Sequence, residues 1–382
     1  MEFSALDHAH MARALRLAEL GLCTTQPNPR VGCVLARGEE IVGEGWHQRA
    51  GEAHAEVFAL RAAGERARGA TAYVTLEPCA HFGKTPPCAD ALIAAGESRV
   101  VVAHEDPFHK VDGQGLAKLR AAGISVDCGL MRDAARELNR GFFSRVERKR
   151  PWLRVKLAMS LDGRTALANG DSKWISGEAA RADVQHWRAR SSAIMTGSGT
   201  VLADDPSLTV RMRKGGQSQF SPLLNGGMQT ALEIDSDPLF EPLRVVLDRT
   251  LRTPRAAQVL DGSAPTLIVH GTDTKPDDRF ARVELAVAPL RDGQPDLAHV
   301  LRMLAERGVN ELQVEAGATL CGALFAVGLV DELLLYIAPI LLGDSGHALL
   351  RLPAFEAIDA APRMRIVEQR QVGDDRRLLL RA

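Results

Sequence analysis

The chain has 382 residues, a length that predicts two domains of ordinary size. With 46% hydrophobic and 25% charged residues it is typical of a globular protein, and its formal net charge of -1 provides no general basic field for nucleic acid or a membrane surface. Six cysteines are too few for a disulfide framework, and neither a signal-peptide core nor a membrane-length apolar run occurs, so we expect a cytoplasmic protein with reduced thiols.

The first part of the chain alternates helical and strand patterns. A helix is predicted from about Ser4 to Leu20, followed by two paired strands joined by a charged turn. The predicted order is strands 31–36 and 40–47, helix 54–67, strand 71–77, helix 88–95 ending at Gly96, and strand 99–106. This alternation predicts a sheet covered by helices on both faces.

A second α/β unit is predicted after a basic, aromatic connector at 139–151. We expect a mostly parallel sheet, domains at 1–145 and 146–382, Ser176 as a helix N-cap, and a surface insertion within the Gly-, Ser-, Gln- and Pro-rich stretch 212–242. The predicted elements are strand 152–160, helix 177–190, strands 193–197, 243–248 and 265–270, helix 297–308, strand 311–317, helix 319–328 and strand 332–340.

Three residues of the first part carry side chains that Zn²⁺ prefers: His54, Cys79 and Cys88. Catalytic zinc sites commonly use three protein ligands and leave the fourth position to water. Glu56 lies about 200° round an ideal helix from His54, so it is badly placed to bind the same ion but could reach that water. We interpret Glu56 as a proton shuttle, because this H-x-E…P-C…C order is that of zinc deaminases.

Cys88 also lies where a thiolate would be stabilised, after two prolines at the predicted start of a helix. We expect both Cys79 and Cys88 to ionise near neutral pH. Two alternatives stay open, namely a structural zinc with His81 as a fourth ligand, or two core cysteines that bind nothing.

Eight residues separate the two cysteines, whereas short zinc deaminases have two there. In this region the chain resembles the deaminase half of the bifunctional riboflavin-biosynthesis enzymes, which carry the patterns PNPxVG, GxGxHxxAGxxHAE and EPCxHxGxTPPC. The corresponding stretches are PNPRVG (27–32), GEGWHQRAGEAHAE (43–56) and EPCAHFGKTPPC (77–88). A further family pattern, DPNPxVxGxG, is broken by Phe108 and His109 in DPFHKVDGQG.

The resemblance implies a cytidine-deaminase-like α/β/α sandwich that binds one Zn²⁺ through His54, Cys79 and Cys88, with Glu56 as the catalytic acid and base. It also implies that three residues contact the pyrimidine and its ribose phosphate: Asn28, His81 and Lys84. A lysine in a loop of this kind suits a phosphate, and a solvated surface lysine is the alternative.

No G-x-G-x-x-G fingerprint follows a strand in the second part, so a standard Rossmann site is not expected. Two glycine-bearing turns after strands could hold phosphate through backbone N–H groups. Four stretches resemble the reductase half of the same family: VKLAMSLDGRTA (155–166), TGSGTVLADDPSLTVR (196–211), VEAGATLCGALFAVGLVDEL (314–333) and YIAPILLG (336–343). This resemblance implies a dihydrofolate-reductase-like α/β domain that uses NADPH.

The same motifs imply individual contacts. The residues assigned to NADPH are Ala158, Trp174, Thr200, Asp204, Gly317, Ala318, Thr319, Leu320, Cys321, Gly322 and Ala323. Those assigned to the reductase substrate are Ser172, Arg188, Leu208, Arg211 and Glu315, to which we add Lys156. Arg188 and Arg211 suit a ribose phosphate because guanidinium groups donate in pairs. Lys156 and Glu315 are expected at strand ends, where they could polarise the sugar carbon or steer a proton, although Lys156 could also be a structural edge lysine.

The leading hypothesis is a bifunctional riboflavin-biosynthesis enzyme that deaminates a diamino-phosphoribosylamino-pyrimidinone and then reduces the ribosyl side chain of the uracil product to ribityl phosphate. We expect a small-molecule substrate, no nucleic-acid or membrane partner, and a homo-oligomer (dimer or tetramer). A nucleic-acid-editing deaminase would need a basic, aromatic groove, which the charge balance and 4% aromatic content do not favour. A structural zinc with a ligand-sensing second domain is the non-enzymatic alternative.

Overall fold

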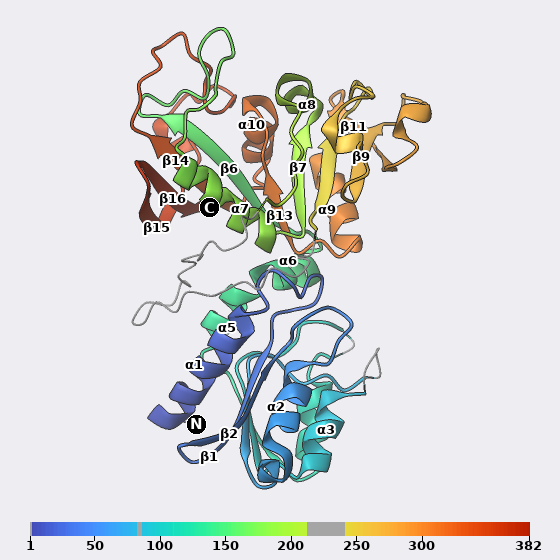
Figure 1. Cartoon of the computed structure of the whole chain (residues 1–382), viewed down its shortest axis with the longest axis vertical. Coiled ribbons are helices and arrows are strands. Elements are labelled where there is room, and N and C mark those ends of the chain that lie inside the picture. Colours follow the sequence, from blue (N-terminus) through green and yellow to red (C-terminus); the bar gives the residue numbers. More distant parts are fainter. Residues whose placement is uncertain (1, 82–85, 110, 212–240) are drawn as a thin grey trace. The chain divides into compact units, whose positions relative to one another are not determined.

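A computed structural model describes residues 2–81, 86–109, 111–211 and 241–382 (Figure 1). These residues form two compact units, one extending to Arg148 and the other beginning at Lys149. The insertion predicted within 212–242 lies almost wholly outside the described residues. Within the described ranges, no helix combines the length and apolar character needed to cross a membrane.

The first unit is built on a five-stranded sheet with the order β2-β1-β3-β4-β5. β1 pairs antiparallel with β2 and β3, whereas β3, β4 and β5 run parallel. The strands are β1 (Gly32–Arg37), β2 (Glu40–Trp46), β3 (Thr71–Val74), β4 (Arg99–Val102) and β5 (Ser125–Cys128). The helices are α1 (Ala5–Glu19), α2 (Ala55–Ala63), α3 (Cys88–Ala95), α4 (Gln114–Ala121), α5 (Arg132–Leu138) and α6 (Arg140–Arg148).

Alternate residues of the strands face two different apolar clusters. Leu35 and its neighbours on one face pack against α2, α3 and α4. Val34 and its neighbours on the other face pack against α1 and α5. This arrangement confirms the predicted α/β/α sandwich, because period-two strands buried on both faces need helices on both sides.

The second unit contains a nine-stranded sheet with the order β10-β9-β8-β7-β13-β6-β14-β16-β15 (Figure 1). It is parallel from β10 to β14, and only β16 and β15 run antiparallel at one edge. Its strands are β6 (Trp152–Ser160), β7 (Ala193–Gly197), β8 (Leu243–Leu247), β9 (Thr266–Gly271), β10 (Glu284–Ala288), β13 (Glu311–Val314), β14 (Glu332–Ala338), β15 (Arg365–Val372) and β16 (Asp375–Arg381). The helices are α7 (Glu178–Arg190), α8 (Ser198–Asp204), α9 (Leu297–Glu306) and α10 (Ala318–Ala326), and β11 (Leu290–Arg291) pairs with β12 (Gln294–Pro295).

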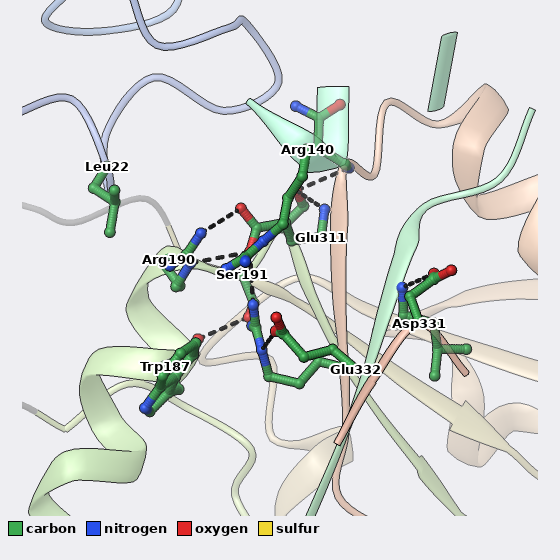
Figure 2. A network of polar contacts seen from close by, with 12 residues as sticks. Leu22, Arg140, Trp187, Arg190, Ser191, Glu311, Asp331 and Glu332 are labelled. Atoms are coloured by element: carbon green, nitrogen blue, oxygen red, sulfur yellow. Dashed lines mark hydrogen bonds and ion pairs between the residues drawn. The ribbon is translucent and has the colours of Figure 1, made fainter. Parts of the chain in front are cut away.

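A buried ionic network fixes α7 against this sheet. Arg154, fully buried on β6, donates to Glu332 at 2.6 Å and to Glu311 at 3.0 Å. Arg190 at the end of α7 also donates to Glu311, and the Arg154 guanidinium lies 4.4 Å from the Trp187 ring centroid. Figure 2 shows Arg190 bonded to Glu311 with Trp187 nearby. Buried charges require such partners, so the network specifies where α7 lies on the sheet.

The connector predicted at 139–151 contains a helix, because Arg140–Arg148 forms α6 and buries Phe142 and Phe143. One local prediction was wrong. Ser176 is not the N-cap of α7. Gly177 takes that position, and its N–H donates to the Asp375 carboxylate at 2.7 Å, a partner distant in sequence.

Glu97, directly after α3, is a buried carboxyl group without a hydrogen-bond partner among the described residues. Burial raises its pKa to about 8, with a partial opposing effect of Arg37. An unfolded glutamate ionises near pH 4.3, so the unfolded state is increasingly favoured as the pH rises from there towards 8. We expect Glu97→Gln to change stability little at pH 4 and to raise it by about 2 kcal/mol at pH 8.5. Urea unfolding at both pH values measures this, and an equal gain at both would contradict the ionic explanation.

Candidate zinc and reductase sites

Two helix starts and the loop after β3 bring His54, Cys79 and Cys88 together. His54 is the N-cap of α2, and Cys88 is the first residue of α3. Their ligand atoms and that of Cys79 all lie within 4.8 Å of one another, with His54 Nδ1 3.2 Å from Cys88 Sγ and 3.6 Å from Cys79 Sγ. Zinc bonds of about 2.0–2.3 Å in a tetrahedron place ligands roughly 3.5 Å apart, so the three residues fit Zn²⁺.

The close approach of α2 to β2 sets the position of His54. An added Cβ at Gly45 would lie 2.4 Å from the carbonyl oxygen of Ala55, the first residue of α2. Only glycine allows this contact, because any side chain would push the start of the helix away. The glycine therefore belongs to the construction of the metal site.

The two cysteines differ in ionisation. Hydrogen bonds from Cys88 and then His54 outweigh burial and lower the pKa of Cys79 to about 4. The backbone N–H of Cys88 also donates to Cys79 Sγ at 3.3 Å. The pKa of Cys88 is instead raised, first because its proton is shared with Cys79 and second because it is buried. Two adjacent buried thiolates repel unless a cation replaces the shared proton, so the expected ionisation of both thiols is linked to metal binding.

Glu56, in the first turn of α2, lines the cavity of the same site. It is 3% exposed, and its Oε2 atom has no hydrogen-bond partner among the described residues. Burial raises its pKa, with a smaller opposing effect of His54. A carboxyl group with a raised pKa, held beside the three metal-type ligands, can both accept and return a proton near neutral pH.

His54, Cys79 and Glu56 line one cavity of about 270 Å³, and Cys88 lies buried directly behind them. Asn28 and His81 line it as well, and Lys84 lies outside the described residues. His81 is not part of the metal-type cluster, so within the described part of the chain three protein ligands are present and not four.

His47, which the sequence interpretation did not single out, orients Asn28 in this cavity. Its Nδ1 lies 3.1 Å from the Ala53 carbonyl oxygen, which can only accept, so Nδ1 carries the proton. The other nitrogen of neutral His47, Nε2, is then an acceptor 3.1 Å from Asn28 Nδ2. The amide of Asn28 is thereby oriented with its oxygen left to accept from a ligand. Burial lowers the pKa of His47, which favours this neutral form.

In the second unit, Lys156, Arg188 and Glu315 form a cluster of charges on the α7 side of the sheet. Arg188 donates Nε and Nη2 to the two carboxylate oxygens of Glu315, both at 2.7 Å. Burial alone would raise the pKa of Glu315, but Arg188 and then Lys156 lower it to about 2. Burial lowers the pKa of Lys156, and Glu315 partly offsets this. Gln313, also missed in the sequence interpretation, donates to Glu315 at 2.8 Å.

These contacts occupy the guanidinium donors of Arg188 in the ligand-free structure. Its paired donors bind Glu315 and its Nη1 donates to the Thr209 carbonyl at 3.0 Å, so its two-pronged side is not directed at a phosphate. Arg211 is exposed, with its backbone N–H bonded to the Gln185 side chain at 2.9 Å. Leu208 is buried in an apolar cluster, whereas Ser172 is partly exposed.

The residues assigned to the cofactor lie at the carboxyl ends of the strands and on the helices that follow. Thr200 and Asp204 belong to α8 after β7, and Ala158 lies on β6. Trp174 is 70% exposed, and the Arg181 guanidinium lies 4.5 Å from the centroid of its ring. The stretch from Gly317 to Ala323 is not a turn: Gly317 is the N-cap and the rest forms the start of α10. The side chain of Cys321 faces the core and donates to the Ala316 carbonyl, which leaves the backbone N–H groups of Ala318, Thr319 and Leu320 at the open helix end.

Comparison with known proteins agrees with this division of chemistry. Residues 4–104 match the family model "Cytidine and deoxycytidylate deaminase zinc-binding region", and residues 151–378 match "RibD C-terminal domain". The riboflavin biosynthesis protein RibD of Escherichia coli is 48% identical over 97% of both chains, and that of Haemophilus influenzae is 46% identical over 99% of this chain and 98% of its own. Among solved structures, RibD of Acinetobacter baumannii (form 1) superposes with a TM-score of 0.87 at 42% identity, covering 98% of both chains.

A deaminase/reductase from Thermotoga maritima, described as acting on diaminohydroxyphosphoribosylaminopyrimidine and 5-amino-6-(5-phosphoribosylamino)uracil, superposes with a TM-score of 0.82 at 31% identity over 98% of both chains. The fold and sites thus define a protein that joins a zinc-binding, cytidine-deaminase-like unit to a dihydrofolate-reductase-like unit. The chain belongs to the RibD family of bifunctional deaminases and reductases of riboflavin biosynthesis.

Proposed function

We propose that the first unit hydrolytically deaminates diaminohydroxyphosphoribosylaminopyrimidine and that the second reduces the ribosyl side chain of the product, 5-amino-6-(5-phosphoribosylamino)uracil, with NADPH. The observation that carries the proposal is the cluster of His54, Cys79 and Cys88, which adjoins the cavity that His54, Cys79 and Glu56 line. The names of the full-length relatives supply the substrates. We place the functional boundary near residues 145–146, and we keep a cytoplasmic location, a small-molecule partner and a homo-oligomer as parts of the proposal.

In the deaminase step, His54, Cys79 and Cys88 would hold Zn²⁺, which supplies the activation of water when it is bound. Glu56 accepts the proton of the attacking water and returns it to the departing amine, so it ends the cycle in its starting state. Asn28, oriented by His47, accepts a hydrogen bond from the pyrimidine and holds the ring over Glu56. We assign His81 and Lys84 to the ribose phosphate end.

In the reductase step, NADPH supplies hydride when it is bound, and the start of α10 with Ala158, Trp174, Thr200 and Asp204 would hold it. Glu315, kept ionised by Arg188, positions the ammonium group of Lys156. Lys156 then donates a proton to the sugar oxygen as hydride reaches the adjoining carbon. Arg211 is assigned to the ribose phosphate, while Ser172 and Leu208 border the same substrate.

The test is to supply the purified protein with the diaminopyrimidine substrate and NADPH and to identify both products by mass spectrometry. We expect the deaminated compound to appear first and to be consumed only when NADPH is present. Absence of deaminated product from a zinc-loaded preparation would refute the assignment of the first unit.

Metal analysis gives a separate readout. We expect about one zinc per chain in the native protein and less than a tenth of that in Cys88→Ser, because removal of one of three ligands lowers affinity by orders of magnitude. Cys128→Ser is the matched control, since this partly exposed cysteine on β5 is not part of the cluster. Equal zinc in Cys88→Ser and native protein would show that the metal binds elsewhere.

A further inference from the structure

The loop after β4 departs from the family pattern at Phe108 and His109. Phe108 lines the same cavity as His54 and Cys79, and it packs against the apolar cluster of Leu76, Phe142 and Phe143. Leu76 and Phe142 line the same cavity. This part of the cavity wall is therefore apolar and carries two aromatic side chains.

The loop that carries Phe108 is held firmly by a buried carboxylate. Glu77, 4% exposed, accepts hydrogen bonds from the backbone N–H groups of Asp106 at 3.2 Å, Gly113 at 3.0 Å and Gly115 at 2.9 Å. These bonds fasten both ends of the segment 106–115, next to Cys79.

Contacts within the loop fix Phe108 itself. Its N–H donates to the Asp106 carboxylate at 2.8 Å, and its carbonyl accepts from Val111 at 2.7 Å. Gly115 is required where the loop joins α4, because an added Cβ would lie 1.9 Å from the Pro78 carbonyl oxygen. The backbone of Phe108 is therefore positioned before any ligand arrives, so little ordering free energy is lost on binding.

We propose that Phe108, backed by Phe142, forms the wall against which the pyrimidine ring of the substrate stacks, and that this contact determines affinity in the deaminase site. The inference rests on the proposed function of this cavity. Stacking of a flat unsaturated ring on an aromatic side chain contributes favourable binding free energy and needs no hydrogen-bond partner. The polar groups of the cavity, Asn28 and Glu56 among them, are then left to read the edge of the ring and to perform the chemistry.

The test compares three variants of this loop in the deaminase assay. Phe108→Leu keeps an apolar side chain but loses the ring, and we expect its KM to rise roughly 5- to 50-fold with kcat within about threefold of the native value. Phe108→Tyr keeps the ring and should have a KM close to native. His109→Ala is the matched control, because the His109 ring lies 4.6 Å from that of Phe108 but is not among the described residues lining the cavity.

Zinc content, melting temperature and reduction of separately supplied deaminated compound report whether each variant is folded. If the KM of Phe108→Leu is unchanged, or if the KM of His109→Ala rises equally, the stacking proposal is overturned. The proposed function is not affected by either result, provided that the native protein deaminates the substrate. Failure of the native protein to deaminate the substrate would instead refute the proposed function itself.

Discussion

Glu56→Gln should abolish deamination, with kcat reduced at least about 1,000-fold, and leave the zinc content unchanged. Glutamine has nearly the same shape but can neither accept the proton of the attacking water nor return one to the leaving amine. General acid–base catalysis is commonly worth 100- to 10,000-fold, and here one residue performs both transfers. The buried setting of Glu56 and its raised pKa are what such a role requires. Steady-state deamination and metal analysis on the same preparation measure the two outcomes.

The matched control for this variant is Glu52→Gln. Glu52 is exposed, lies four residues earlier and does not line the cavity among the described residues, so its neutralisation should leave kcat within a factor of two or so. Reduction of the separately supplied uracil compound should be normal in both variants. Substantial deamination by Glu56→Gln with full zinc occupancy would remove Glu56 from the mechanism and point to another proton carrier.

Arg188→Met should lower reductase activity roughly 100-fold and destabilise the second unit by about 3–5 kcal/mol. The change leaves the partly buried Glu315 without its two-pronged partner and beside Lys156. Breaking one side of a buried ion pair costs more than the pair itself contributes, because the remaining charge cannot regain its hydration. The displaced carboxylate would also misplace Lys156. Urea unfolding of the second unit measures the loss of stability, and the rate of NADPH oxidation measures the loss of reductase activity.

The double variant Arg188→Met, Glu315→Gln separates stability from catalysis. Removing both charges should restore much of the lost stability, since no isolated carboxylate remains, whereas the reductase activity should stay low. If Arg188 instead bound the substrate phosphate, the single variant would raise KM strongly with little change in stability, and the double variant would be no more stable. Deamination should be retained throughout.

Much of the architecture was predictable from local patterns. The strand 152–160 and the strand 193–197 were predicted to the residue. The helix starting near Ser4 follows from its capping box. Elements with weaker apolar patterns were missed, including α4, β5 and the β15–β16 edge, whose residues are largely polar. The edge strands are stabilised by pairing with distant partners and not by their own periodicity.

The sequence by itself determined the types of residue in the metal site, their order, and the cationic and anionic groups of the reductase site. Ligand chemistry is carried by residue identity, and short motifs preserve it at fixed spacing. Only the tertiary structure decided how these groups are used. It brought the two cysteines within hydrogen-bonding distance, paired Arg188 with Glu315, and placed Phe108 in the cavity wall. The physical reason is that ionisation, ion pairing and burial depend on distances between groups far apart in the chain, which spacing along the sequence does not encode.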